Sequence, residues 1–428
     1  MKISQVTGRE IFDSRGLPTV ECEIVLEEKK SEQMVSLIAS VPSGLSKGKH
    51  EALELRDGDK RLAGKGVSKA IENLETKIAP ILLGKEPDVI SMDMKIIEAD
   101  GTENKSHLGA NATLAASLAI LKAQALVNGL KPYELVAALC EFESVSLPVP
   151  MFNIINGGVH ADNSIDFQEF LLIPSGQSNF RSAIEAAATI FYKLKELLEK
   201  RGLQKCIGDE GGFAPQLKNE QEALDLIMEA IAQVENIEGN FSLGIDVAAS
   251  RLYDSKTQLY TIGNKTYNRQ QLISFYEELS TKYPISYIED GFSEDDWEGW
   301  KELNQAMGKN LQIVGDDIFA TNINQIGKGI KENIANAVLI KPNQIGTVTE
   351  TLQAILTAKE HGLDTIISHR SGETNDNIIV DLAIGTQTMQ IKAGGLTRGE
   401  RLAKYNHLLR IEDRLTMMFI ENEITSPL

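Results

Sequence analysis

The pattern of hydrophobic and polar positions changes near residue 140. Before it, TVECEIVLEE and MVSLIASVP alternate apolar and polar residues, which predicts two half-buried strands. GVSKAIENLETKIAPIL and the Ala-rich GANATLAASLAILKAQALVNG predict helices, the second capped by Asn111 or Ser106 and ended by Gly129. Strands followed by helices predict a small α+β domain over residues 1–140.

Beyond residue 140, short apolar runs end repeatedly in a charged residue, followed by a turn and a helical pattern. These runs are SLGID, SYIED, LQIVGDD, AVLIK, TIISHR and MQIK. Most are spaced by the roughly 25 residues that one βα unit occupies, and the longest interval has room for a hairpin at QLYTIGNKTYN. With PMFNIING and QEFLLIP they supply eight strands, which predicts an α/β fold with a (β/α)8-type barrel over residues 141–428. A two-layer βα sandwich is the alternative, but it does not easily place six charged strand ends around one point.

Three carboxylates end successive strands of this predicted barrel. Asp246, Glu289 and Asp316 should therefore lie side by side at its mouth. Without a cation, such a group would repel or shift its pKa values upward. Oxygen-only ligands with room for water suit Mg²⁺, so the spacing favours a metal site. The alternative is three unrelated acids that stabilise helix N-termini.

Cations end the next three strands, at Lys341, at His369 with Arg370, and at Lys392. Together with a metal and Ser371 of HRSGE, they form a set that suits an anionic substrate carrying phosphate and carboxylate. Because Lys392 and Mg²⁺ would disfavour its charged form, Lys341 could act as a base. The alternative is that Lys341 only pairs with a neighbouring acid, either Glu289 or Asp316.

Two Gly-rich segments carry further polar groups: GDEGGF contains Glu210, and NGGVHADNSIDFQEF contains His160, Gln168 and Glu169. Two glutamates in one pocket would leave one protonated near neutral pH, as an acid for a leaving group requires. Taken alone, either segment is weak evidence of a site, because a Gly-rich loop is more often only a turn.

A third flexible segment, VPSGLSKGKHEALELRD, lies in the small domain and is predicted to lead into a helix. It has the composition of a lid that carries a hydroxyl ligand, Ser46, and a cation, Lys47. An ordinary surface loop is the alternative.

The composition limits which classes of binding partner and which cellular compartment fit this protein. The 428 residues include 43 Lys and Arg against 61 Asp and Glu, a net charge of −18, which disfavours nucleic acids and anionic membranes. Cys22, Cys140 and Cys206 show no C-x-x-C spacing, which indicates three buried thiols in a reducing compartment. No apolar run approaches the ~20 residues of a membrane span, and MKISQVTGREIFDSRG has no apolar h-region. We therefore expect a cytoplasmic protein without a membrane span.

The motifs as a set resemble those of the enolase family from about residue 5 to about residue 412. They include FDSRGLPTVE, VPSGLSKGKHEALELRDGD, GTENKSHLGAN, NGGVHADNSIDFQEF, GDEGGFAP, IEDGFSEDDW, VGDD, IKPNQIGT, SHRSGET and QIKAG, in the order of that family. The Lys or His base working with Mg²⁺ is a general pattern of that superfamily.

The resemblance implies dehydration of 2-phosphoglycerate to phosphoenolpyruvate with two Mg²⁺ per active site. Asp246, Glu289 and Asp316 would bind one ion, and Ser46 with the substrate phosphate would help to hold the second. Lys341 would remove the C2 proton, and Glu210 would protonate the departing C3 hydroxyl. Glu169 and His369 would complete the catalytic set, while Lys392 would meet the carboxylate, Arg370 and Ser371 the phosphate, and His160 and Gln168 would line the pocket.

The resemblance also implies a homodimer formed through the small domain, with octamers in some bacterial members, and a secondary cell-surface or secreted presence. Leu45 and Lys47 stand where the usual SGAST lid has Ala and Thr. An enolase paralogue with an altered substrate, as in phosphonate biosynthesis, is therefore an alternative, and an additional binding or scaffold role is another.

Overall fold

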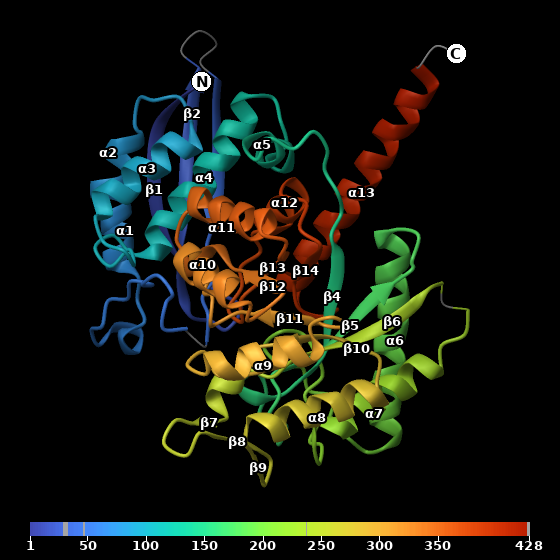
Figure 1. Cartoon of the computed structure of the whole chain (residues 1–428). Coiled ribbons are helices and arrows are strands. Elements are labelled where there is room, and N and C mark those ends of the chain that lie inside the picture. The colour runs from blue at the N-terminus through green and yellow to red at the C-terminus, as the bar shows by residue number, and fades with distance from the viewer. Residues whose placement is uncertain (29–32, 46–47, 237, 426–428) are drawn as a thin grey trace.

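The computed structural model describes residues 1–28, 33–45, 48–236 and 238–425. A three-stranded sheet with its helices precedes a closed eight-stranded barrel, and a long C-terminal helix runs away from the barrel (Figure 1). The expected fold class is therefore confirmed. The division at residues 140 and 141 stays a prediction.

The N-terminal sheet is antiparallel and has the order β1-β2-β3, with β1 at Lys2–Phe12, β2 at Pro18–Glu28 and β3 at Gln33–Ser40. β2 and β3 are the two predicted strands, whereas β1 was not predicted. It is an edge strand in which Ile3 is the buried hydrophobic residue, so it lacks the alternation expected of a half-buried strand. The helices of this part are α1 (Ser68–Asn73), α2 (Ala79–Leu82), α3 (Val89–Asp100), α4 (Ala110–Val127) and α5 (Pro132–Leu139).

Helix α4 forms the core of the N-terminal part and packs against β2, β3, α3 and α5. It begins after Gly109, so the predicted cap at Asn111 or Ser106 is wrong. The amide of Asn111 instead holds the preceding loop, because its Oδ1 accepts from the Leu55 amide at 3.1 Å and its Nδ2 donates to the Leu55 carbonyl at 3.0 Å. Gly129 follows the helix with a φ of 70°, as predicted for its end.

One prediction from composition is wrong: of the three cysteines, Cys22 and Cys140 are buried, but Cys206 is exposed. Among the described helices, α4 is long and apolar enough to cross a membrane by length and composition, and 78% of this stretch is buried inside the protein. The expectation that the chain has no membrane span stays a prediction.

All eight predicted barrel strands are present. They are β4 (Val149–Asn156), β5 (Glu169–Ser175), β6 (Asn240–Asp246), β10 (Ile285–Glu289), β11 (Gln312–Gly315), β12 (Ala337–Ile340), β13 (Asp364–Ser368) and β14 (Gln390–Lys392). The barrel closes where β14 pairs with β4. Side chains such as Leu171, Tyr287 and Leu339 fill an inner core separate from the larger core around it.

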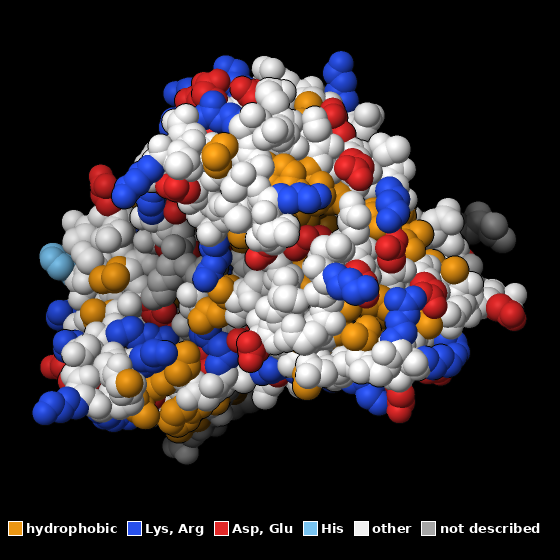
Figure 2. Space-filling model, turned by 90° about the horizontal axis from the view of Figure 1, so that it is seen from below, with side chains coloured by type: hydrophobic (Ala, Val, Ile, Leu, Met, Phe, Trp, Pro, Cys, Tyr) orange, Lys and Arg blue, Asp and Glu red, His pale blue; other side chains and the backbone are white. Residues whose placement is uncertain are grey.

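Helices follow the strands on the outside. They are α6 (Phe180–Lys200), α7 (Glu220–Ala232), α8 (Arg269–Lys282), α9 (Trp297–Met307), α10 (Ile323–Glu332), α11 (Val348–Glu360), α12 (Ile378–Gly385) and α13 (Gly399–Thr425). The predicted hairpin is also present, with β8 at Leu259–Ile262 and β9 at Lys265–Tyr267 beside β7 at Tyr253–Asp254. On the face shown in Figure 2, positive and negative side chains are interspersed rather than segregated.

One barrel strand, β5, runs antiparallel to both of its neighbours. The segment between β4 and β5 contains only a short helical turn at Gly158–His160, so the chain turns back instead of crossing over. As a result, the first residue of β5 lies at the barrel face where the parallel strands end. Glu169 pairs there with Asp246, the last residue of β6.

The loop after β3 reaches the barrel mouth. Ser43 and Gly372 exchange backbone hydrogen bonds of 2.8 and 2.9 Å, and Glu51 accepts two hydrogen bonds from the guanidinium of Arg370. Residues 48–60 form turns and irregular backbone, so the helix predicted to follow the lid is absent there. Ser46 and Lys47 lie outside the described residues.

Candidate active site

A pocket with about 410 Å³ of empty space opens at the carboxyl ends of the parallel strands. Eleven of the thirteen predicted site residues line it: His160, Gln168, Glu169, Glu210, Asp246, Asp316, Lys341, His369, Arg370, Ser371 and Lys392. Glu289 lies directly behind it and contacts Lys392, whereas Ser46 is outside the described residues. A larger groove, mostly apolar, lies at the opposite end of β4, beside α6 and α13. The predicted chemistry therefore converges at the barrel face on which enzymes of this architecture place their active sites.

Lys392 is the electrostatic centre of the pocket. Its buried Nζ lies 2.7 Å from Glu289 Oε2, 3.0 Å from Glu169 Oε2 and 3.3 Å from Asp246 Oδ2. Burial lowers the pKa of Lys392, but these carboxylates outweigh it and hold the pKa well above its usual range. The Tyr287 hydroxyl also donates to Glu289 Oε2, at 2.5 Å. Lys392 is therefore a fixed positive charge.

Lys341 follows β12 and pairs with Asp316. Gln344 Nε2 donates to the other oxygen of this carboxylate at 3.2 Å. Burial lowers the pKa of Lys341, but Asp316 more than offsets it and leaves this pKa above its usual value. Burial likewise raises the pKa of Asp316, and Lys341 reverses that shift. The ion pair left open by the sequence is thus present, and in it Lys341 holds its proton.

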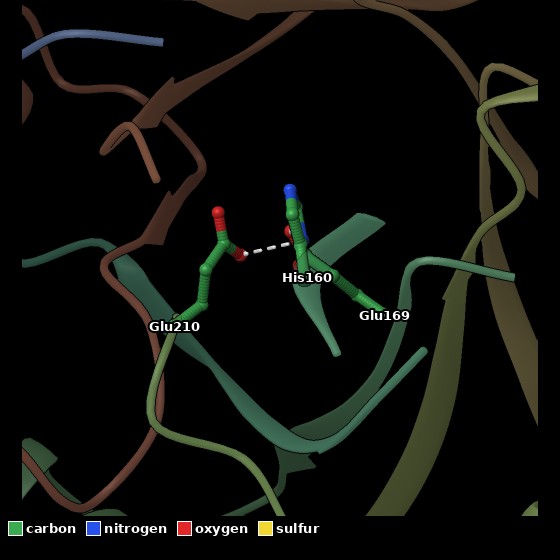
Figure 3. A group of neighbouring side chains, drawn as sticks. All are labelled: His160, Glu169 and Glu210. Carbon is green, nitrogen blue, oxygen red and sulfur yellow. Dashed lines mark ion pairs between the residues drawn. The ribbon is translucent and has the colours of Figure 1, made fainter. Parts of the chain in front are cut away.

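Glu210, Glu169 and His160 face one another inside the pocket (Figure 3). His160 Nδ1 lies 3.5 Å from Glu210 Oε2 and 3.7 Å from Glu169 Oε1. Burial, and next the charge of Glu210, raise the pKa of Glu169 well above its usual value. Burial lowers the pKa of His160 to about 4, so this imidazole is neutral at pH 7. Glu169 therefore holds a proton beside Glu210, and can pass it to Glu210 when that group acts as the acid.

The anion-binding side of the pocket is formed by the segment after β13. Arg370 donates to Glu51 at 3.1 and 3.2 Å and to Asn343 Oδ1 at 3.1 Å. Ser371 Oγ accepts from the Leu45 amide at 2.8 Å. Glu51 was not predicted as a site residue, because the sequence indicated a helix at this point rather than a carboxylate turned toward the barrel.

The predicted metal ligands come from adjacent strands, since β10 pairs with both β6 and β11. Lys392 contacts both Asp246 and Glu289, and Lys341 contacts Asp316. Among the described residues, Glu289 Oε1 is nevertheless a buried carboxylate oxygen without a hydrogen-bond partner. An all-oxygen set with an unsatisfied anionic oxygen fits a hard divalent cation.

Among the described residues, two groups place ligand atoms within 4.8 Å of one another: His160 with Glu169 and Glu210, and Asp290 with Asp316 and Asp317. The predicted trio is therefore not itself such a group, although it shares Asp316 with the second one. Asp290 and Asp317 are the second acids of IED and GDD and were not predicted, because the prediction assigned one acid to each strand end. The Asp290 carboxylate accepts the backbone amides of Asp316 at 2.9 Å and Asp317 at 3.1 Å. It therefore shapes the turn that carries Asp316.

The closed barrel gathers buried carboxylates, ammonium groups and neutral imidazoles at the carboxyl ends of its strands. This arrangement defines an acid–base barrel enzyme. A family model described as the enolase C-terminal TIM barrel domain matches residues 144–422, and one described as the enolase N-terminal domain matches residues 3–136. The chain belongs to the enolase family, which indicates a lyase of the hydratase type. Members of this family typically use Mg²⁺, and the acidic groups described above could hold a metal ion.

Proposed function

We propose that this protein catalyses the reversible, Mg²⁺-dependent dehydration of 2-phosphoglycerate to phosphoenolpyruvate. The observation that carries the proposal is the convergence of Lys341, Lys392 and Glu210 in one pocket of an enolase-family barrel. These groups supply a base, a fixed positive charge and an acid. The reaction removes a proton from C2 and a hydroxyl from C3, and so requires all three.

The C2 proton is weakly acidic because its removal places a second negative charge on the adjacent carboxylate. The Lys392 ammonium, excluded from water, offsets that charge where it develops. Lys341 Nζ accepts the C2 proton, and Glu210 delivers a proton to the C3 oxygen, which leaves as water. Arg370 and Ser371 hold the phosphate, and the neutral His160 and His369 add no charge of their own beside Glu210.

Mg²⁺ would be held by Asp246, Glu289 and Asp316, with a second ion held by Ser46 and the substrate phosphate. Bound there, such a cation would supply positive charge to the substrate carboxylate and would weaken the hold of Asp316 on the Lys341 ammonium. The unpartnered Glu289 Oε1 supports this ligand set. Lys341, which lies against Asp316, would then act as the base.

Absorbance of phosphoenolpyruvate provides the test. Purified protein given 2-phosphoglycerate should produce the signal with Mg²⁺, lose it with chelator and regain it on Mg²⁺ readdition. Absence of any Mg²⁺-dependent signal from folded protein contradicts the proposal.

A paralogue acting on a related substrate is the second candidate, and it is favoured by the position of Leu45. This residue lines the pocket, and its amide binds Ser371 Oγ. The side chain is larger than the alanine usual in the family lid. A large rise in 2-phosphoglycerate turnover in Leu45→Ala/Lys47→Thr would support specialisation away from this substrate, and unchanged turnover would contradict it.

We also propose a cytoplasmic homodimer formed through the N-terminal part, with an octamer as the larger alternative. No direct nucleic-acid partner is expected, because the net charge is −18. Light scattering distinguishes monomer, dimer and octamer, and fractionation of cells with an antibody against the protein tests both the cytoplasmic location and a secondary surface presence. Pull-down from lysate tests an additional binding or scaffold role.

A further inference from the structure

Arg401, in the first turn of α13, is fully buried and binds two segments of the pocket wall at once. Its Nη2 donates to the carbonyl of Asp209 at 2.9 Å and to that of Ser371 at 2.7 Å. Its Nη1 donates to the carbonyl of Arg370 at 2.7 Å and contacts the ring Nδ1 of His369. The guanidinium therefore joins the segment that carries Glu210 to the segment that follows β13.

The backbone nearby leaves room for this side chain. Gly394 has a φ of 89°, and a Cβ there would lie 2.6 Å from Arg401 Cδ. The next residue, Gly395, donates its amide to the carbonyl of Glu210 at 2.7 Å. Two glycines after β14 thus allow α13 to insert a cation beneath the pocket.

The chemistry of the contact with His369 fixes the position of a proton. All five N–H groups of a guanidinium donate and none of its nitrogens accepts, so His369 Nδ1 must be the acceptor. Burial, and next the positive charge of Arg401, hold the pKa of His369 well below its usual value, so the ring is neutral. A neutral imidazole that accepts at Nδ1 carries its proton on Nε2. That nitrogen lies 3.6 Å from Glu210 Oε2, which Asn153 Nδ2 also approaches at 3.3 Å.

We propose that Arg401 is a positioning residue that holds His369 in its Nε2-protonated tautomer, with the N–H directed at Glu210 Oε2. In that arrangement the ring stabilises the carboxylate that remains after Glu210 has given its proton to the C3 oxygen. The opposite tautomer would turn a lone pair toward that carboxylate and repel it. The catalytic consequence rests on the proposed function, whereas the tautomer itself does not.

The tautomer is read directly from two-bond ¹H–¹⁵N spectra of protein labelled at its six histidines, without substrate. The His369 ring signals are assigned by their loss in His369→Gln. We expect an unprotonated Nδ1 and a protonated Nε2 at pH 6–8 in the wild type, and a mixture of tautomers in Arg401→Met. A protonated Nδ1 in the wild type overturns the inference, as does a folded Arg401→Met with an unchanged tautomer.

Lys404→Met is the matched control, because Lys404 is an equally buried cation on the same helix that binds Glu373 and the Thr374 carbonyl instead. It should leave the His369 signals unchanged, and loss of the Nε2-protonated state in this variant would contradict a specific role for Arg401. Arg401→Lys retains a donor and should keep the tautomer. If Arg401→Met does not fold, the spectra of the wild type and of Arg401→Lys still test which tautomer His369 adopts.

Kinetics separate positioning from general structural damage. Arg401→Met should lower kcat about 10- to 100-fold, as for partners that orient a functional imidazole, while KM changes less than about threefold, and Arg401→Lys should retain most of the wild-type kcat. A rise in KM with unchanged kcat contradicts the positioning role. If the wild type does not turn over 2-phosphoglycerate, the proposed function fails, and the spectra still test the tautomer.

Discussion

Replacing Lys392 by methionine removes a positive charge that contacts three buried carboxylates. The ammonium lies 2.7 to 3.3 Å from Glu289, Glu169 and Asp246, and its side chain is 2% exposed. At an effective dielectric of about 20, each contact contributes roughly 5–6 kcal/mol of attraction. Desolvation of the four groups and repulsion among the carboxylates oppose much of this. Removal of one partner from a buried ion pair costs about 3–5 kcal/mol, and we expect Lys392→Met to lose about this much stability in chelator.

The assay is urea unfolding followed by far-UV circular dichroism, in chelator and again in Mg²⁺. If a cation binds Asp246 and Glu289, Mg²⁺ should reduce the difference between variant and wild type, because it replaces part of the missing positive charge. Lys193→Met is the control, since Lys193 forms a 2.8 Å pair with Glu196 on the surface and should change stability by less than about 1 kcal/mol. A Lys392→Met loss no larger than that of the control refutes the reasoning. A loss that is identical with and without Mg²⁺ refutes the proposed metal position.

Three further predictions concern the pocket and the contact between the two parts of the chain. Lys341→Ala should lower turnover by about 10²- to 10⁴-fold and leave Mg²⁺ binding by calorimetry nearly intact; loss of the metal with turnover would favour a purely structural ion pair. Glu210→Gln should lose dehydration but keep exchange of the C2 proton with deuterated solvent by NMR, because Lys341 remains; loss of both would contradict the separate roles. Asp93 of α3 joins the two parts of the chain, because its Oδ2 accepts hydrogen bonds from the amide and hydroxyl of Thr349 in α11 at 2.9 and 2.7 Å. Burial raises the pKa of Asp93 from 3.8 to about 6, so this carboxyl holds its proton in the folded state to higher pH than in the unfolded state. Its effect therefore reduces stability by about 3 kcal/mol as pH rises from about 4 to above 6, and Asp93→Asn should flatten that part of a urea-unfolding series; an unchanged pH slope would contradict it.

The barrel was predictable because six of the apolar runs that form its parallel strands end in a charged residue. Asp246, Glu289 and Lys392 each close an apolar run of a few residues, and parallel strands must bring such ends to one face. The reversal of β5 was not predictable in this way, because QEFLLIP has the same apolar character in either direction. Edge strand β1 was missed for the related reason that it is mostly solvated and shows no alternation.

The predicted site residues came together, but their pairing depends on geometry that the sequence does not contain. Lys341 was a candidate base with an ion pair as the alternative, and the ion pair with Asp316 followed only from side-chain positions. No sequence pattern identified Arg401 as a site residue, because a charged residue in the first turn of a polar helix is ordinarily exposed to solvent. Its role depends on the burial of α13 against the segments on either side of the pocket.

The pairing of β14 with β4 also sets an order for assembly during synthesis. The first barrel strand has no partner on one side until the last one has been made, and Lys392 is the final residue of that strand. At roughly 5–20 residues per second, Glu169, Asp246 and Glu289 leave the ribosome well before their shared cation does. Until then these acids must remain hydrated or protonated, so the nascent barrel stays open and its inner face stays exposed to solvent. Truncation before β14 should therefore yield a chain that aggregates rather than a smaller stable barrel.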